Sequence, residues 1–186
     1  SPRGRVKRSP LHSSGSCWRR PILDVNSSAY LSNGYARGVK VPVTMAVRTL
    51  RNAGIEFVPH LYRYEPGGGA AAGAAALGVD PHNVVKTLIM ETETGDPMIV
   101  LMHGDREVST KALARHLGVR QVRPCAPEVA DRHSGYQVGG TAPLGTRRPM
   151  PAYCELGIAE LPRIYVNGVE EASTSLTYSP SSVAAM

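Results

Sequence analysis

The stretch VVKTLIM at residues 84–90, followed after a turn by MIVLM at residues 98–102, decides the fold of this chain. Both runs are short, apolar and rich in residues that favour strands, and residues 93–97 between them have the composition of a tight turn. The pair therefore predicts a β-hairpin buried within a sheet. Neither run is long enough to cross a bilayer, and we expect no membrane-spanning segment.

Helix signals lie on both sides of this hairpin. Thr44 is a suitable N-cap for a helix that ends at Gly54, and Ser109 is a suitable N-cap for a helix over residues 110–117 that ends at Gly118. An Ala-rich helix is expected at residues 70–78, a helix start at Asp80-Pro81 and a helical turn near Glu128. The chain is thus expected to contain three or four helices.

Several further short strands are predicted, over residues 56–64, 119–122, 136–138, 152–154 and 163–166. Pro59 suggests that the first of them is an edge strand, because proline cannot donate a hydrogen bond to a neighbouring strand. Short strands interspersed with helices predict a mixed α/β domain around a twisted mixed sheet or a small barrel.

Composition divides the 186 residues into three parts. Residues 1–40 hold eight Lys or Arg and one acidic residue, so the net charge of +6 is concentrated there, and we expect a basic, disordered tail. Residues 41–168 form the expected domain. Residues 169–186 are polar and atypical, so the sheet is expected to keep an open edge near residues 163–166.

Three segments could carry chemistry. Lys86 lies in an apolar strand, where partial desolvation would strengthen its attraction for an anion, although a lysine reaching out from a strand end is the more ordinary reading. The loop GGTAPLG at residues 139–145 could present backbone N–H groups to a ligand, or it could be only a turn. Alternation puts His60, Tyr62 and Tyr64 on one strand face, which is either a ligand wall or an amphipathic edge.

The sequence contains none of the usual motifs for metal binding, disulfide frameworks, catalytic nucleophiles or nucleotide binding. Cys17, Cys125 and Cys154 are odd in number and widely spaced, which fits a reducing compartment and neither a disulfide framework nor a zinc finger. The six histidines form no H-E-x-x-H pattern, and no nucleophile elbow, Walker loop or dinucleotide fingerprint is present. We therefore expect no metal and no cofactor.

Several segments, in this order, resemble the YbaK/EbsC family of transfer RNA editing deacylases, which is related to the editing domain of bacterial prolyl-tRNA synthetase. The matching segments are PHLY (59–62), ALGVD (76–80), VVKTLIM (84–90), VLMHGDREVSTKALARHLGV (100–119), RHSGYQVGGTAPLGTRR (132–148) and LPRIYVNG (161–168). The likeness covers residues 43–168 and implies a YbaK-like domain.

The resemblance implies a role for individual residues. Lys86 would hold the terminal adenosine or phosphate of the acceptor end, with Thr87, Tyr62 and His60 lining the same pocket. Gly139, Gly140, Thr141, Ala142 and Pro143 match the family's G-x-x-x-P loop, whose amides would face the aminoacyl carbonyl. Ala142 stands where the family usually has serine, and Thr141 beside it keeps a hydroxyl. Glu155 falls where members often have an acid.

The implied function is trans-editing: hydrolysis of the ester of mischarged tRNA, with Cys-tRNA(Pro) as the first substrate considered. In the cysteine-specific branch of the family the thiol of the substrate is thought to attack the ester. Ala-tRNA(Pro) or another aminoacyl-tRNA is the alternative substrate, and a non-catalytic aminoacyl- or nucleotide-binding relic is the alternative function. The expected partners are the acceptor end of aminoacyl-tRNA and prolyl-tRNA synthetase, with no DNA and no membrane, in the cytoplasm.

Overall fold

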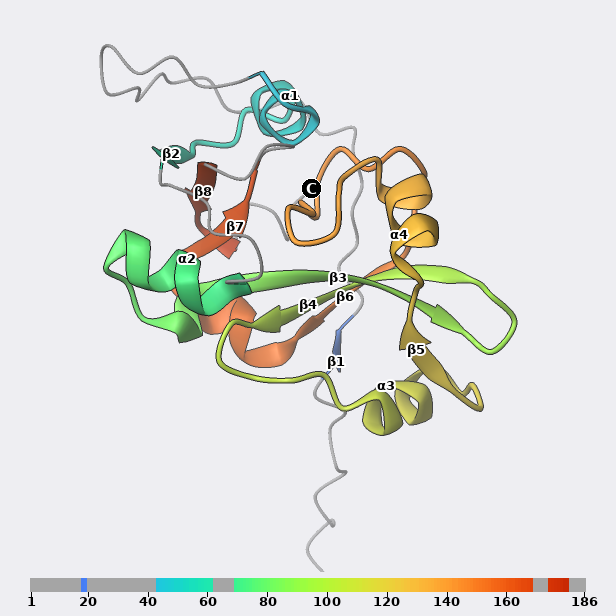
Figure 1. The fold of residues 1–186 in the computed structure, drawn as a ribbon. Coiled ribbons are helices and arrows are strands. Elements are labelled where there is room, and N and C mark those ends of the chain that lie inside the picture. Colours follow the sequence, from blue (N-terminus) through green and yellow to red (C-terminus); the bar gives the residue numbers. More distant parts are fainter. Residues whose placement is uncertain (1–17, 20–42, 62–68, 169–173, 181–186) are drawn as a thin grey trace, which may run out of the picture.

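A computed structural model describes residues 18–19, 43–61, 69–168 and 174–180, and these form a mixed α/β domain as predicted (Figure 1). Its sheet has the order β1-β6-β4-β3-β7-β8-β2, with β5 paired to β3 beside this path. The order has two different end strands, β1 and β2. Of the two predicted alternatives, the described residues therefore form the mixed sheet and not the barrel.

The predicted hairpin forms the centre of the sheet. β3 (Val84–Thr92) pairs antiparallel with β4 (Pro97–His103), in a register that runs from Val85 opposite His103 to Glu91 opposite Pro97. β3 also pairs in parallel with β7 (Ile164–Asn167) and antiparallel with β5 (Val122–Pro124). β3 is thus hydrogen-bonded to three other strands and lies inside the sheet. This position accounts for its almost continuous apolar run.

The remaining strands extend the sheet on both sides of the hairpin. β6 (Ala152–Glu155) lies parallel to β4, and the two-residue strand β1 (Trp18–Arg19) pairs with β6. On the other side, β8 (Thr174–Tyr178) pairs antiparallel with both β7 and β2 (Val58–Leu61). β2, which contains Pro59, is the predicted edge strand.

Four α-helices occur in the described residues: α1 (Met45–Asn52), α2 (Gly69–Leu77), α3 (Thr110–Leu117) and α4 (Pro127–Ser134). Two short 3-10 helices, Pro81–Asn83 and Leu156–Glu160, precede β3 and follow β6. The predicted caps are confirmed, since the Thr44 hydroxyl accepts from the N–H of Val47 at 3.2 Å and Gly118 ends α3 with φ of 70°. α1 and α4 lie on one side of the sheet and α3 on the other (Figure 1).

Alternation along β3 feeds separate cores on the two faces of the sheet. Val85 packs with residues of α1 such as Val47 and Leu50. Leu88 and Met90 pack with Leu113 of α3 on the opposite face. The sheet is therefore covered on both sides.

Two predicted strands differ from the structure. Residues 136–138 form a loop, because the buried Tyr136 donates its hydroxyl to the carbonyl of Leu144 at 2.7 Å and folds the segment back on itself. The strand predicted at 119–122 begins only at Val122. The carboxylate of Glu93 accepts from the N–H groups of Arg120 and Gln121 at 3.1 and 3.2 Å, so these two residues are used in a turn.

The expected open edge near residues 163–166 is wrong. β8 covers β7, and its residues Ser175, Leu176, Thr177 and Tyr178 are all at least 95% buried. The polar character of this segment misled the prediction, because Ser175 satisfies its hydroxyl within the sheet by donating to the carbonyl of Val166 at 3.1 Å.

Of the predicted tail, only Trp18 and Arg19 belong to the described residues, and they pair with β6. The division at residues 40 and 168 stays a prediction. None of the helices in the described ranges has the length and apolar character needed to cross a bilayer.

Candidate functional site

A pocket of about 320 Å³ opens on the face of the sheet that also carries α4. Its floor is β3 from Val84 to Ile89, and its walls come from the small residues of α2, from α4 and from the loop at residues 138–141. Asn167 of β7 and Ser175 of β8 close one side. The lining is mostly apolar with a few convergent polar groups, which is the usual character of a small-molecule site.

Two of the predicted residues, Lys86 and Thr87, are adjacent along β3, and both belong to the lining of this pocket. The hydroxyl of Thr87 is buried and has no hydrogen-bond partner among the described residues, so it can serve a ligand. The ammonium of Lys86 donates to the carbonyl of Arg106 in the loop after β4. To reach a ligand, Lys86 would exchange this neutral acceptor for an anionic one, which forms the stronger hydrogen bond.

Gly139 and Thr141 of the predicted loop line the same pocket. Gly139 has φ of 97°, a conformation that favours glycine, and its carbonyl accepts from the side-chain amide of Asn167 at 3.0 Å. The N–H of Gly140 donates to the carbonyl of Gln137 at 3.0 Å and is used inside the loop. The N–H groups of Gly139 and Thr141 donate to no other described residue, so these two amides can face a ligand.

Asn167 is a site residue to which the sequence pattern assigned no role, since it stood out only as part of the segment LPRIYVNG at residues 161–168. It lines the pocket and holds Gly139, which is 28 residues away along the chain. Nothing in the local sequence around Asn167 distinguishes this contact from a turn.

The rest of the predicted loop packs away from the pocket. Ala142 is completely buried, in the core that also holds Tyr136 and Leu144. Pro143 is buried as well, and neither residue is part of the pocket lining. The missing hydroxyl at position 142 is therefore a change within the core and removes no group from the lining.

His60 lies on β2, outside the pocket lining, with its ring 5.6 Å from that of Tyr165. Burial and then the nearby Arg163 lower the pKa of His60 from its ordinary value, so the ring is neutral at pH 7. Tyr62 and Tyr64 fall outside the described residues, so the predicted place of Tyr62 in the pocket stays a prediction.

Glu155 is likewise placed outside the pocket lining and binds a buried histidine instead. One of its carboxylate oxygens lies 2.9 Å from Nε2 of His103 and accepts from the N–H of Gly157 at 2.8 Å. The other ring nitrogen of His103, Nδ1, donates to the carbonyl of His82 at 2.6 Å. His103 is fully buried, so both of its nitrogens are satisfied by the protein.

The structure also brings His82, His103 and Asp105 together, with one possible ligand atom of each within 4.8 Å of the others. The geometry does not suit a metal ion. The two imidazole rings stack at 3.8 Å and only 12° from parallel, so their lone pairs, which lie in the ring planes, cannot converge on one point. His82 pairs with Asp105 at 3.1 Å, and the group is a hydrogen-bonded network.

Cys125 lines the pocket and was not expected there. Burial, together with the carboxylate of Glu91 nearby, raises its pKa to about 11. The thiol therefore stays protonated at neutral pH, and a protonated thiol is a poor nucleophile.

Comparison with known proteins identifies the kind of domain that carries this pocket. The family model described as an aminoacyl-tRNA editing domain matches residues 65–179, more than half of the chain. The proline–tRNA ligase of Moorella thermoacetica is 36% identical over 97 residues, which are 52% of this chain and 16% of that protein. EbsC of Enterococcus faecalis, named as a candidate Cys-tRNA(Pro)/Cys-tRNA(Cys) deacylase, is 28% identical over 80 residues, 43% of this chain and 49% of its own.

Solved structures share the fold. A crystal structure described as that of a candidate trans-editing enzyme for prolyl tRNA synthetase has a TM-score of 0.64 and 22% identity. The likeness covers 78% of this chain and 91% of that one. At this level of identity the comparison establishes the architecture and leaves the chemistry to the site.

Proposed function

Because this chain belongs to the aminoacyl-tRNA editing domain family, we propose that it hydrolyses the ester bond of mischarged tRNA, with Cys-tRNA(Pro) as its substrate. One observation carries the proposal: Lys86, Thr87, Gly139 and Thr141, from segments about fifty residues apart, line one pocket. The chain spans only about one sixth of the length of the prolyl-tRNA ligases that it matches. Activity in trans on a free aminoacyl-tRNA is part of the proposal, because a protein of the same fold is described as a candidate trans-editing enzyme for prolyl tRNA synthetase.

The pocket supplies the groups that ester hydrolysis needs. Attack on the aminoacyl carbonyl builds negative charge on its oxygen, and the free N–H groups of Gly139 and Thr141 would stabilise that charge. The unpartnered hydroxyl of Thr87 would bind the ester or the terminal ribose. Lys86 would leave the Arg106 carbonyl to hold a phosphate of the acceptor end.

The nucleophile in this mechanism does not come from the protein. The thiol of Cys125, with its pKa of about 11, is protonated and held against Glu91, so it is not poised to attack. For a cysteinyl ester, the thiol of the substrate can attack its own carbonyl carbon instead. The bond from that carbon to the ribose oxygen breaks, the ribose oxygen takes up the thiol proton, and water then hydrolyses the cyclic thioester to cysteine. The protein needs to supply position and polarisation.

Such an activity would correct a predictable error. A synthetase pocket shaped for proline cannot strongly reject a smaller side chain, since one methylene is worth only about 1–3 kcal/mol. The pocket volume of about 320 Å³ is near the small end of ligand sites, roughly 300–1,000 Å³, which fits the ester of a small amino acid.

Prolyl-tRNA synthetase, in the cytoplasm, is the partner that we propose for delivery of the substrate.

The test is a deacylation assay with purified full chain and tRNA(Pro) charged with cysteine, alanine or proline. We expect rapid loss of cysteine and slow or no loss of proline. Faster loss of alanine would replace the substrate and exclude attack by a substrate thiol, so that water would be the nucleophile. If the chain releases none of the three amino acids, it is a binding module and not an enzyme.

Gly139 offers a direct test of the loop. Gly139→Ala would strain the backbone at φ of 97° and displace the neighbouring amides, so kcat/KM should fall at least tenfold, on the order of the effect of one misplaced donor. Gly118→Ala is the matched control, because Gly118 also has positive φ, at 70°, but lies at the end of α3 away from the pocket. Both variants should lose similar stability in thermal melts. Equal losses of activity in the two would show that the loop has no special role.

A further inference from the structure

The net charge of the domain hides a strong local asymmetry. Between residues 132 and 154 the chain has three arginines and a histidine but no Asp or Glu, and residues 43–55 also lack any acid. The first of these segments is the one that supplies the pocket residues Gly139 and Thr141. The segment that supplies pocket residues therefore also carries positive charge.

Backbone contacts bring the two ends of the arginine-bearing part of the first segment together. The loop returns to the end of α4, where the N–H groups of Arg147 and Arg148 donate to the carbonyls of Ser134 and His133 at 2.9 and 3.1 Å. The backbone of both arginines thus lies against the last turn of α4, the turn that also carries Arg132. All three are exposed.

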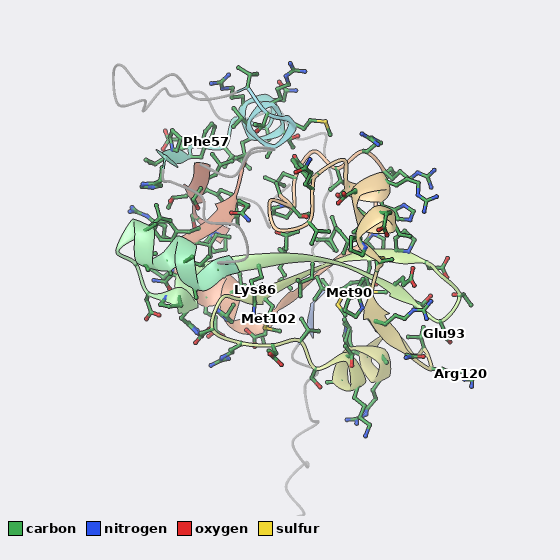
Figure 2. All side chains as sticks on the ribbon, in the orientation of Figure 1. Phe57, Lys86, Met90, Glu93, Met102 and Arg120 are labelled. Atoms are coloured by element: carbon green, nitrogen blue, oxygen red, sulfur yellow. The ribbon has the colours of Figure 1, made fainter. Side chains whose placement is uncertain are left out.

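α1 adds a fourth arginine to this surface. Gly145 packs so closely on α1 that a Cβ at that position would come within 2.7 Å of the backbone of Met45. Arg48 lies three residues further along α1, hence on the same helix face as Met45, and it is exposed. Figure 2 shows nitrogen-tipped side chains projecting from α1 and α4 into solvent.

These charges are not neutralised locally. No ion pair joins Arg48, Arg132, Arg147 or Arg148 to an acid within the described part of the chain, and the acids of α4, Glu128 and Asp131, pair with none of them. By contrast, Arg123 on β5 is paired with Glu91 at 2.8 Å. Four exposed, unpaired arginines, three of them in the segment that also supplies the pocket residues Gly139 and Thr141, are suited to bind a polyanion, because each can contact a phosphate and release a counterion.

We propose that Arg48, Arg132, Arg147 and Arg148 form a docking surface for the phosphate backbone of the tRNA acceptor arm, an inference that rests on the proposed function for its choice of RNA. The surface binds nucleotides that precede the terminal adenosine in the pocket. It reads no bases, since arginine contacts to phosphates position a nucleic acid without specifying its sequence.

The experiment compares the full chain with two charge-matched triple variants. One carries Arg132→Gln, Arg147→Gln and Arg148→Gln. The control carries Lys111→Gln, Arg115→Gln and Arg120→Gln, three exposed basic residues on or just after α3, on the other side of the sheet (Figures 1 and 2). The basic residues of segment 1–40 are present in every protein and cannot account for a difference.

Binding of uncharged tRNA(Pro) is measured first, by fluorescence anisotropy over a range of salt concentrations. The docking-surface variant should bind about tenfold more weakly or worse at moderate salt, and the slope of log K against log[salt] should become shallower by about 2–3, since each lost phosphate contact contributes about 0.9. The control should bind like the unmodified chain. Equal weakening in both variants, or no binding by the unmodified chain, would overturn the proposal.

Hydrolysis separates this inference from the proposed function. On cysteinyl-tRNA(Pro) the docking-surface variant should show a raised KM with kcat nearly unchanged. On a cysteinyl ester of adenosine, too short to reach the surface, it should match the unmodified chain. If the unmodified chain hydrolyses neither substrate yet its tRNA binding depends on the surface, the proposed function fails and the docking surface stands.

Discussion

Replacing Lys86 with alanine is expected to lower kcat/KM for mischarged tRNA by about 100-fold, the scale of losing one well-placed electrostatic contact in an active site. Lys86 is the single cationic residue in the pocket lining that the structure describes. Its ammonium is bound to one carbonyl, that of Arg106, and can be transferred to a phosphate oxygen at little cost to the fold.

Lys86→Arg should restore little of this activity. A planar guanidinium is wider than an ammonium, and it cannot replace a compact point charge on the floor of a small pocket. Lys111→Ala on α3 is the control for a general loss of charge and should keep full activity. Thermal melts of both alanine variants should lie close to that of the unmodified chain.

A cysteine variant completes this experiment. Cys125→Ser should keep most of the activity, because the thiol is protonated and serves only as part of the pocket wall. A folded but inactive Cys125→Ser protein, together with an active Lys86→Ala protein, would contradict the mechanism and point to covalent catalysis by the protein.

Removal of the Glu155 side chain should have the largest effect on stability. Glu155→Ala leaves Nε2 of the fully buried His103 without its partner and also frees the N–H of Gly157. Breaking a buried pair by deleting one member costs about 3–5 kcal/mol, a large share of the free energy of unfolding of an ordinary domain.

Two matched variants test the cause. Glu155→Gln keeps an oxygen that can accept both hydrogen bonds, so it should lose far less stability and retain kcat/KM. Glu160→Ala removes an exposed carboxylate five residues away and should be nearly neutral. Urea unfolding measures the free energy of unfolding of all three variants, and their m values should be the same. A loss of activity in a stable Glu155→Gln protein would restore the substrate-binding role first expected for this residue.

The local elements of the fold could be predicted because their signals are short-range. A cap such as Thr44 or Ser109 needs only an N–H three residues ahead, and Gly118 needs only its own φ. The β3–β4 hairpin joins strands through a turn of a few residues. For such contacts the sequence alone carries the necessary information.

The positions of the site were predictable for another reason. The resemblance to an editing family singled out Lys86, Thr87 and the Gly139–Pro143 loop, and four of the residues so chosen line one pocket. It did not distinguish the residues that face the pocket from those, such as Ala142 and Glu155, that support the fold around it. Which side of a loop or strand meets the ligand depends on packing.

Only the tertiary structure decided the contacts between distant segments. Glu155 meets His103 across 52 residues, Asn167 meets Gly139 across 28, and the arginines at 48, 132 and 147 gather from three segments. β8 looked too polar for a core strand, yet it is buried because β7 and β2 satisfy its backbone on both sides. A strand or an ion pair of this kind is stabilised by its partner, and the residues near it in sequence do not indicate which partner that is.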